Sequence, residues 1–233
     1  METITMKLKY FCMPFLSLLL FFSVYANSQG GIAVSTTRII YNADKKEAAI
    51  SISNRGIENY YIIQSWIEDV AGKKVDDFIL TPPLFKLNAN KENMVRIINK
   101  TALPQDRETV FWLNMKAIPP IPKNGLQNGL QIAIKTKLKL FYRPKGLSGT
   151  PFESAKKIIW KESNGFLSIE NNSPYNITID NLLINNNKNS FSTMILAFSS
   201  ENTSIKIKTG DNLAFKIVND LGSKSEQITT SIK

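Results

Sequence analysis

The fold of this chain is decided by a stretch that reads LPQDRETVFWLNMKAIP, from Leu103 to Pro119. Its second part, Thr109 to Ile118, is rich in β-branched and aromatic residues, which favours a β-strand. Pro119 ends the strand, because proline has no backbone N–H to donate to a neighbouring strand. The stretch therefore predicts one strand of a sheet with a sharp stop.

Short runs of the same kind recur on both sides of it, separated by clusters of Gly, Asn, Asp, Lys and Pro. In the first half, the predicted strands are Ile32 to Tyr41, Ala48 to Ser53, Tyr60 to Glu68, Phe78 to Leu87, Met94 to Ile98, Thr109 to Ile118 and Leu130 to Tyr142. In the second half, they are Phe166 to Glu170, Ile177 to Asp180, Met194 to Phe198, Ser204 to Ile207, Leu213 to Val218 and Gln227 to Ile232. Seven strands in the first half suit an immunoglobulin-like sandwich, so we expect an all-β chain.

Side chains alternate between two faces within these runs. Ala48, Ile50 and Ile52 fall on one face of their strand, which predicts an apolar side that packs inward. Trp66 and Trp112 have side chains large enough to fill the space between two sheets. We therefore expect both tryptophans in the core.

Proline, glycine and asparagine mark the breaks between strands. Pro82-Pro83 interrupts one run, and the bond between Thr81 and Pro82 is expected to be cis. Asn185 to Asn189 predict a turn. The Pro and Gly content of Tyr142 to Gly149 predicts a short linker between two domains.

The N-terminus has the features of a secretory signal peptide. Lys7 and Lys9 precede an apolar run, Phe11 to Val24, and small residues then lead to a cleavage site near Ala26. A membrane anchor is the alternative, but the run is shorter than the ~20 residues that a spanning helix needs. We expect a signal peptide over residues 1–26, a first domain over 27–146 and a second over 147–233.

Composition excludes most hydrolase chemistry. The chain has no histidine, and its single cysteine, Cys12, lies in the expected signal peptide. Ser/His/Asp and Cys/His catalysis, the usual zinc ligand sets and any disulfide are thereby excluded from the mature chain. Paired carboxylates of the glycosidase type stay open. The net charge of +10 favours acidic partners, but export and the absence of an aromatic stacking pattern argue against nucleic acid.

The stretch from Leu103 to Pro119 closely resembles the signature segment of the periplasmic pilus chaperones, the PapD-like family. Tyr61 to Ile67 and Thr81 to Leu87 resemble the third and fourth strands of that family, and Leu138 to Pro144 resembles its interdomain run. The resemblance continues more weakly through Asn171 to Tyr175 and Val218 to Gly222. The resemblance implies two immunoglobulin-like β-sandwich domains in an L-shaped arrangement, with a cleft between them, in the periplasm. The short link from Pro119 to Leu130 resembles the short-loop subclass.

The resemblance also implies a mechanism. Chaperones of this family insert their seventh strand, here Leu130 to Leu140, into the open groove of a fimbrial subunit. Leu130, Ile132 and Ile134 fall on one face and would fill successive groove pockets. The other interpretation is that these three residues face the core of their own domain, and periodicity alone favours it. The match of the family's client-binding positions favours the first interpretation.

Two polar sets follow from the same resemblance. Arg38 and Lys139 match the basic pair that binds the C-terminal carboxylate of the client. Glu108, Arg143 and Asp220 match an interdomain ionic network. The family often carries a disulfide in the second domain, which this chain cannot form.

The function expected from the sequence is that of a chaperone without cofactor, metal or catalytic residue. It would bind, fold and cap fimbrial subunits and deliver them to an outer-membrane usher, with no membrane insertion after signal cleavage. An exported immunoglobulin-like adhesin or fibre component is the main alternative, and a carbohydrate-active enzyme is a third. Whether the free protein forms a self-capping dimer stays open.

Overall fold

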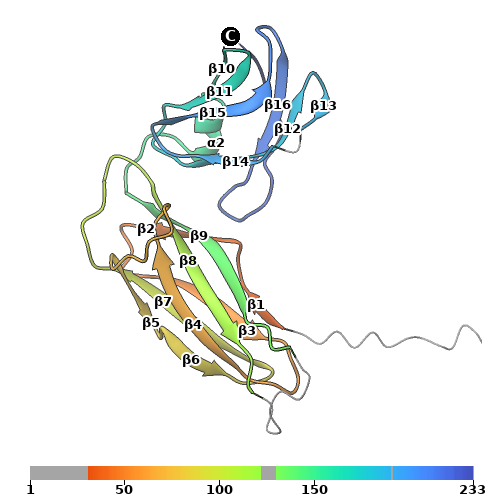
Figure 1. The fold of residues 1–233 in the computed structure, drawn as a ribbon. Coiled ribbons are helices and arrows are strands. Elements are labelled where there is room, and N and C mark those ends of the chain that lie inside the picture. Colours follow the sequence, from red (N-terminus) through yellow and green to blue (C-terminus); the bar gives the residue numbers. More distant parts are fainter. Residues whose placement is uncertain (1–30, 122–129, 190, 233) are drawn as a thin grey trace, which may run out of the picture. The chain divides into compact units, whose positions relative to one another are not determined.

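The computed structural model describes residues 31–121, 130–189 and 191–232 (Figure 1). The expected signal peptide over residues 1–26 lies outside these residues. The same is true of most of the link, 122–129, whose length suggested the short-loop subclass. Within the described ranges, no helix is long and apolar enough to cross a membrane.

The first domain is a sandwich of two sheets. The four-stranded sheet has the order β1 (Ile32–Val34), β3 (Ala48–Asn54), β7 (Lys91–Asn99) and β5 (Phe78–Thr81). The five-stranded sheet has the order β2 (Arg38–Asn42), β9 (Ile134–Arg143), β8 (Thr109–Ile118), β4 (Tyr61–Glu68) and β6 (Leu84–Leu87). Neighbouring strands are antiparallel in both sheets, except β2 and β9, which are parallel.

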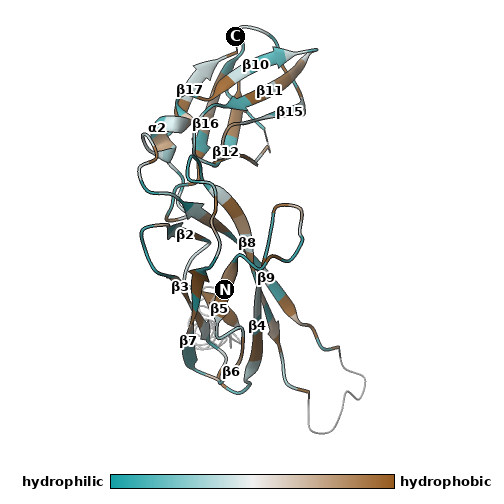
Figure 2. Ribbon diagram, turned by 90° about the vertical axis from the view of Figure 1, so that its left-hand side faces the viewer, coloured by the Kyte–Doolittle hydropathy of each residue, from teal (hydrophilic) through white to brown (hydrophobic). Residues whose placement is uncertain are grey.

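Alternate residues of both sheets form the core of this domain. Ile50 and Ile52 from β3 meet Ile63 from β4, Leu113 from β8 and Leu140 from β9, and all five are almost fully buried. Burying a side chain of this size contributes about 1.5–3 kcal/mol. The alternation expected from Ile50 and Ile52 is thus confirmed, and Figure 2 shows the hydrophobic bands on β8 and β9.

The second domain is also built almost entirely of strands. One sheet has the order β10 (Ile159–Ser163), β11 (Phe166–Asn171) and β15 (Ser199–Lys206). The other has the order β13 (Asn187–Lys188), β12 (Ile177–Ile184), β16 (Asn212–Ile217) and β17 (Ile228–Ser231), with β14 (Thr193–Ile195) also paired to β12. Trp160 and Phe215 lie at the centre of its core, with ring centroids 4.8 Å apart.

Two long runs predicted for the first domain are each divided in the structure. Ile32 to Tyr41 forms β1 and β2, which belong to different sheets. Phe78 to Leu87 forms β5 and β6, which also belong to different sheets, because the chain bends at Pro82-Pro83. The bond between Thr81 and Pro82 is cis, as the sequence predicts.

Two elements of the second domain were not predicted. The short helix α2 (Pro151–Ala155) follows the linker, and the side chain of its N-cap residue Thr150 accepts a hydrogen bond from the Glu153 N–H. Threonine before proline is a usual helix start, so the sequence carried this signal. Strand β10 was also missed. The expected turn over Asn185 to Asn189 holds Asn185 and Asn186 at positive φ, although its next two residues form β13.

The prediction that Trp66 and Trp112 fill the core is wrong. Ile63 and Ile67 point inward from β4, so the intervening Trp66 points to the opposite face of the sheet. Trp112 likewise lies next to the inward-facing Leu113 on β8. Both tryptophans are half-buried on the outer face of the five-stranded sheet. The tryptophan that does fill a core is Trp160.

This difference between the tryptophans predicts a difference in stability. Trp160→Ala should lower the free energy of unfolding by about 3–5 kcal/mol, because it leaves a cavity in the second domain. Trp66→Ala should cost well under half of that, because the indole is bounded by solvent on its outer side. Urea unfolding of the mature chain, followed by circular dichroism, measures both. Equal losses would contradict the placement of Trp66.

Candidate functional site

Strand β9 has an open edge. On one side it pairs with β8 from Ile134 to Tyr142. On the other side β2 pairs with it only from Lys139 to Arg143. In the described ranges, Ile134–Leu138 therefore have no strand on that second side. Open backbone N–H and C=O groups at a sheet edge form a template for a further strand.

The strand begins later than the sequence predicts. It starts at Ile134 rather than Leu130, because its pairing with β8 ends where Ala117 lies opposite Ile134. Beyond Ile118, Pro119 and Pro120 cannot donate ladder hydrogen bonds. The Gln131 side chain instead donates to the carbonyl oxygens of Pro119 and Pro120, at 2.9 and 3.1 Å.

Three alternate apolar side chains lie at the start of this open segment and just before it. Leu130, Ile132 and Ile134 are 85%, 64% and 62% exposed. They alternate in step with Thr136, which is partly buried, and with Leu138 and Leu140, which are buried in the core. Their own domain thus leaves the first three in solvent and buries the leucines further along the strand. Isolated exposed hydrophobes are common, but a regular series on an open edge is typical of an interaction site.

A small apolar cavity of about 40 Å³ adjoins the open edge. Ile32 and Val34 of β1 line it on one side and Ile134 of β9 on the other, with core residues such as Ile52 and Met115 behind them. The mouth of the sandwich between β1 and β9 is therefore apolar as well as open.

Arg38 and Lys139 lie side by side at the far end of the open edge, where they are paired residues of β2 and β9. The Arg38 Nη1 donates to the Val218 carbonyl oxygen at 2.9 Å, and the Lys139 Nζ donates to Thr178 Oγ1 at 3.2 Å. In the described part of the chain, neither cation has a carboxylate within salt-bridge distance. The Arg38 Nε is buried and has no hydrogen-bond partner among the described residues.

The electrostatics of this pair favour an anion. Burial, and then the charge of Arg38, lower the pKa of Lys139 to about 8. Burial also lowers the pKa of Arg38, although Asp220 and Glu108 oppose this effect. Half-buried like charges are costly to keep together without a counter-charge. A carboxylate at this position would relieve the repulsion between the two cations.

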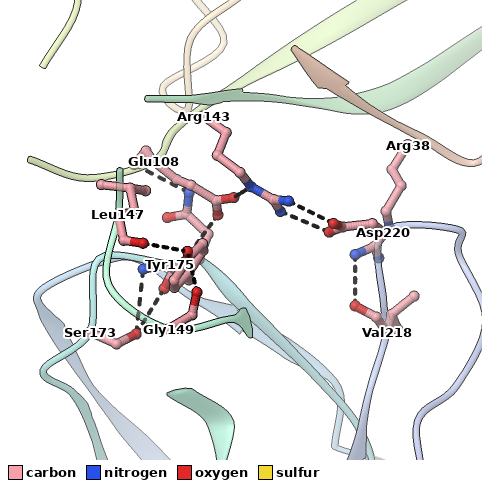
Figure 3. Close-up of polar contacts among 10 residues, drawn as sticks. Arg38, Glu108, Arg143, Leu147, Gly149, Ser173, Tyr175, Val218 and Asp220 are labelled. Carbon is pink, nitrogen blue, oxygen red and sulfur yellow. Dashed lines mark hydrogen bonds and ion pairs between the residues drawn. The ribbon is translucent and has the colours of Figure 1, made fainter. Parts of the chain in front are cut away.

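Glu108, Arg143 and Asp220 are brought together by the structure (Figure 3). The Arg143 guanidinium donates to both oxygens of Asp220, at 2.6 and 2.8 Å, and through its Nε to Glu108. The Glu108 carboxylate is almost fully buried and also accepts from the Asn176 N–H at 2.9 Å. Burial raises the pKa of Glu108, and Arg143 opposes that rise. These bonds connect residues of the first domain with residues of the second.

Several residues of this network were not predicted as site residues. The Asn176 side chain donates to the Glu108 carbonyl and accepts from the Ala197 N–H. The Tyr175 hydroxyl donates to the Gly149 carbonyl at 2.8 Å, and the Arg143 guanidinium lies 5.5 Å from its ring centroid. The weak resemblance around Pro174-Tyr175 was the one sequence signal for them.

Gly222 is a second residue that the sequence did not single out. Its φ is +83°, and a Cβ at this position would lie 2.2 Å from the Thr37 Oγ1. Only glycine permits this approach between the loop after β16 and the segment before β2. Its place in the run Val218 to Gly222 was the only hint.

Comparison with known proteins gives a consistent result. The model of the PapD N-terminal domain of pili and flagellar-assembly chaperones matches residues 31–148, and that of the pili assembly chaperone PapD C-terminal domain matches 153–229. The chaperone protein LpfB of Salmonella typhimurium is 39% identical over 208 residues, which are 87% of this chain and 90% of that protein. The chaperone protein FimC of Escherichia coli K12 is 36% identical over 211 residues, 88% of this chain and 86% of that one.

Solved structures agree with these relatives. The crystal structure of the periplasmic chaperone SfaE aligns with a TM-score of 0.75 and 35% identity, over 85% of this chain and 98% of that one. A chain in the structure of the Salmonella enterica SafA pilin in complex with the SafB chaperone aligns with a TM-score of 0.79 and 25% identity, over 89% and 99%. Both domains are immunoglobulin-like, as the sequence predicts. The chain therefore belongs to the PapD-like family of pili assembly chaperones.

Proposed function

We propose that this protein is a periplasmic chaperone that binds, folds and caps fimbrial subunits by donor-strand complementation and passes them to an outer-membrane usher. The observation that carries the proposal is the open edge of β9. Ile134 at its start and the preceding Leu130 and Ile132 are exposed apolar side chains, and the edge ends at two cations without a carboxylate partner in the described ranges. Periplasmic location and pilin binding are supported by the relatives SfaE and SafB.

The position of the cations sets the direction of the client strand. Arg38 and Lys139 lie at the C-terminal end of the open segment Ile134–Leu138. A client strand that ends in its carboxylate at these cations and also covers the segment must run parallel to β9. Backbone hydrogen bonds to the open edge would then hold the strand in register.

The binding energies are of the right size. Filling groove pockets with Leu130, Ile132 and Ile134 would contribute about 1.5–3 kcal/mol for each side chain that is fully buried. Each charge-assisted hydrogen bond to the client carboxylate would add about 1.5–3 kcal/mol. Association and ordering cost about 4–15 kcal/mol, so both halves of the strand are needed for stable capture. No cofactor or covalent step is required.

The ionic network has a supporting role in this proposal. Lys139 reaches Thr178, and Arg38 reaches Val218, both in the second domain. Glu108, Arg143 and Asp220 would hold that domain against the first, so that these two cations keep their positions. They are positioning residues and would not touch the client.

The adhesin alternative gains no support. A fibre subunit of that kind would lack one strand of its own sandwich. In the part of the chain that the structure describes, the first domain has a four-stranded and a five-stranded sheet of its own. Strand β9 lies between β2 and β8 in the second sheet, so that position is already occupied.

Ile132→Asp should abolish recovery of complexes with a co-expressed fimbrial subunit, because a carboxylate cannot enter an apolar groove pocket. Ile79→Asp is the matched control. Ile79 is 48% exposed and lies on β5, at the opposite edge of the other sheet from β1, so complexes should survive. Co-purification from a periplasmic extract measures both. If the Ile132→Asp variant folds and still yields complexes, the groove-filling role is wrong.

Lys139→Ala should weaken client binding by about 10- to 100-fold, the equivalent of one charge-assisted hydrogen bond. In the wild type, binding should also weaken as the pH rises through about 8, where Lys139 loses its proton. The sign follows because a bound carboxylate raises the pKa of Lys139, so that binding above pH 8 takes up a proton. Lys139→Arg stays charged in this range and should lack the decline. Calorimetric titrations from pH 6.5 to 9.5 would overturn the anchor if both proteins give the same profile.

Glu108→Ala should lower the free energy of unfolding by about 3 kcal/mol, because it removes a buried acceptor from Arg143 and Asn176. Glu170→Ala is the control, since its pair with Lys161 lies at the surface and should contribute little to stability. Denaturant titration measures both. Similar small losses in the two variants would show that the network does not hold the domains.

A further inference from the structure

The outer face of β9 carries a ladder of lysines over two indoles. Lys135, Lys137 and Lys139 occupy alternate positions on this face. The Lys135 Nζ lies 4.9 Å from the Trp66 ring centroid, and the Lys137 Nζ lies 4.7 Å from that of Trp112. The Lys139 Nζ lies 5.9 Å from the same Trp112 ring. The tryptophans that were expected in the core thus support cations at the surface.

In the described part of the chain, Glu68 is the carboxylate that contacts Lys135 and Lys137. Glu68 accepts from the Trp66 Nε1 at 2.7 Å, and both Lys135 and Lys137 lie 3.4 Å from it. The hydrogen bond from Trp66 and those from the two lysines lower the pKa of Glu68. Glu68 therefore keeps its charge and helps to hold both ammonium groups in place.

The face as a whole remains strongly positive. Strand pairing places these cations on it: Arg38, Lys86, Lys116, Lys135, Lys137 and Lys139. Among the strand residues of this face, Glu68 is the one carboxylate. The side chains of Lys135 and Lys137 are still 45% and 40% exposed, so neither lysine is enclosed by its contacts with Glu68 and the indoles.

We propose that the Lys135 and Lys137 ladder recognises carboxylate side chains on the client strand that pairs with β9, so that clients of this chaperone carry Asp or Glu at alternate positions of that strand. The inference rests on the proposed function, because it requires a strand at the open edge. The client strand would then contact two faces of β9, and its acidic side chains would be recognised on the basic face.

The geometry of a β-sheet connects the ladder with the open edge. In a paired strand, alternate side chains point to the same face as their neighbours on the adjoining strand, about 5 Å away. A client strand beside Ile134–Leu138 would therefore place one set of side chains near Ile134 and the apolar cavity. The other set would lie on the same face as Lys135 and Lys137, whose ammonium groups now reach toward Glu68 and the indoles on the β8 side and would turn toward the client strand. Charge complementarity on that second face favours acidic residues.

A pair of synthetic peptides tests the proposal. Both alternate valine with a polar residue, are long enough to reach from Lys139 back to Leu130, and end in a free carboxylate. The polar residue is aspartate in one and asparagine in the other. With the intact chaperone at low ionic strength, the aspartate peptide should bind about tenfold more tightly, and the difference should shrink as salt is added.

Lys135→Gln together with Lys137→Gln should abolish the difference between the peptides and leave binding of the asparagine peptide unchanged. The matched control is Lys45→Gln with Lys46→Gln, which removes the same charge from the turn between β2 and β3 and should keep the difference. Circular dichroism confirms that each variant is folded. Calorimetry or NMR titration gives the affinities.

The outcomes separate the two proposals. Equal affinities of the two peptides for the intact chaperone would overturn the ladder and leave the donor edge standing. A preference for aspartate that survives in the Lys135 and Lys137 double variant would also overturn it. Failure of both peptides to bind would overturn the donor edge itself, and the ladder with it.

Discussion

The proposed site depends on the unequal pairing of the two sides of strand β9. One side pairs with β8 from Ile134 to Tyr142, but the other side pairs with β2 only from Lys139 onward. The covered half buries Leu138 and Leu140 in the core and is held on both sides. The uncovered half is continuous with this anchored half, but its backbone groups on the second side have no strand partner in the described ranges. An edge strand is normally a liability that proteins blunt with charge or short length. Here the exposed Leu130, Ile132 and Ile134 lead into the open edge, and the lysines of the strand lie on one face.

The charges around β9 follow from the same alternation. One parity of the strand gives Ile134, Leu138 and Leu140, and the other gives Lys135, Lys137 and Lys139. A single strand therefore presents an apolar face and a basic face to whatever lies beside it. The ammonium groups of Lys135 and Lys137 lie over the indoles of Trp66 and Trp112, and these contacts restrict the conformations of both lysines.

Much of this could be predicted from the sequence, because strand composition and alternation are local properties. Thr109 to Ile118 was predicted with both of its ends, since Pro119 sets its limit. The start of β9 could not be, because the strand begins where its partner β8 ends and not where its own composition changes. Trp66 and Trp112 were misplaced because size alone favoured the core, whereas their parity relative to Ile67 and Leu113 decides the face. Asn176 and Gly222 act through contacts between distant segments, which no local pattern records.

The contacts between the domains and the cation pair form one arrangement. Arg38 binds the Val218 carbonyl, Arg143 binds Asp220 two residues further on, and Gly222 packs against Thr37. The same short loop thus touches the first domain at three points around the basic pair. Arg38 bonds to the loop through one nitrogen and has no carboxylate partner in the described part of the chain, whereas Arg143 binds two carboxylates. The two arginines therefore differ in role: Arg143 joins the domains, and the loop holds Arg38 in place as a cation that an anion can still approach.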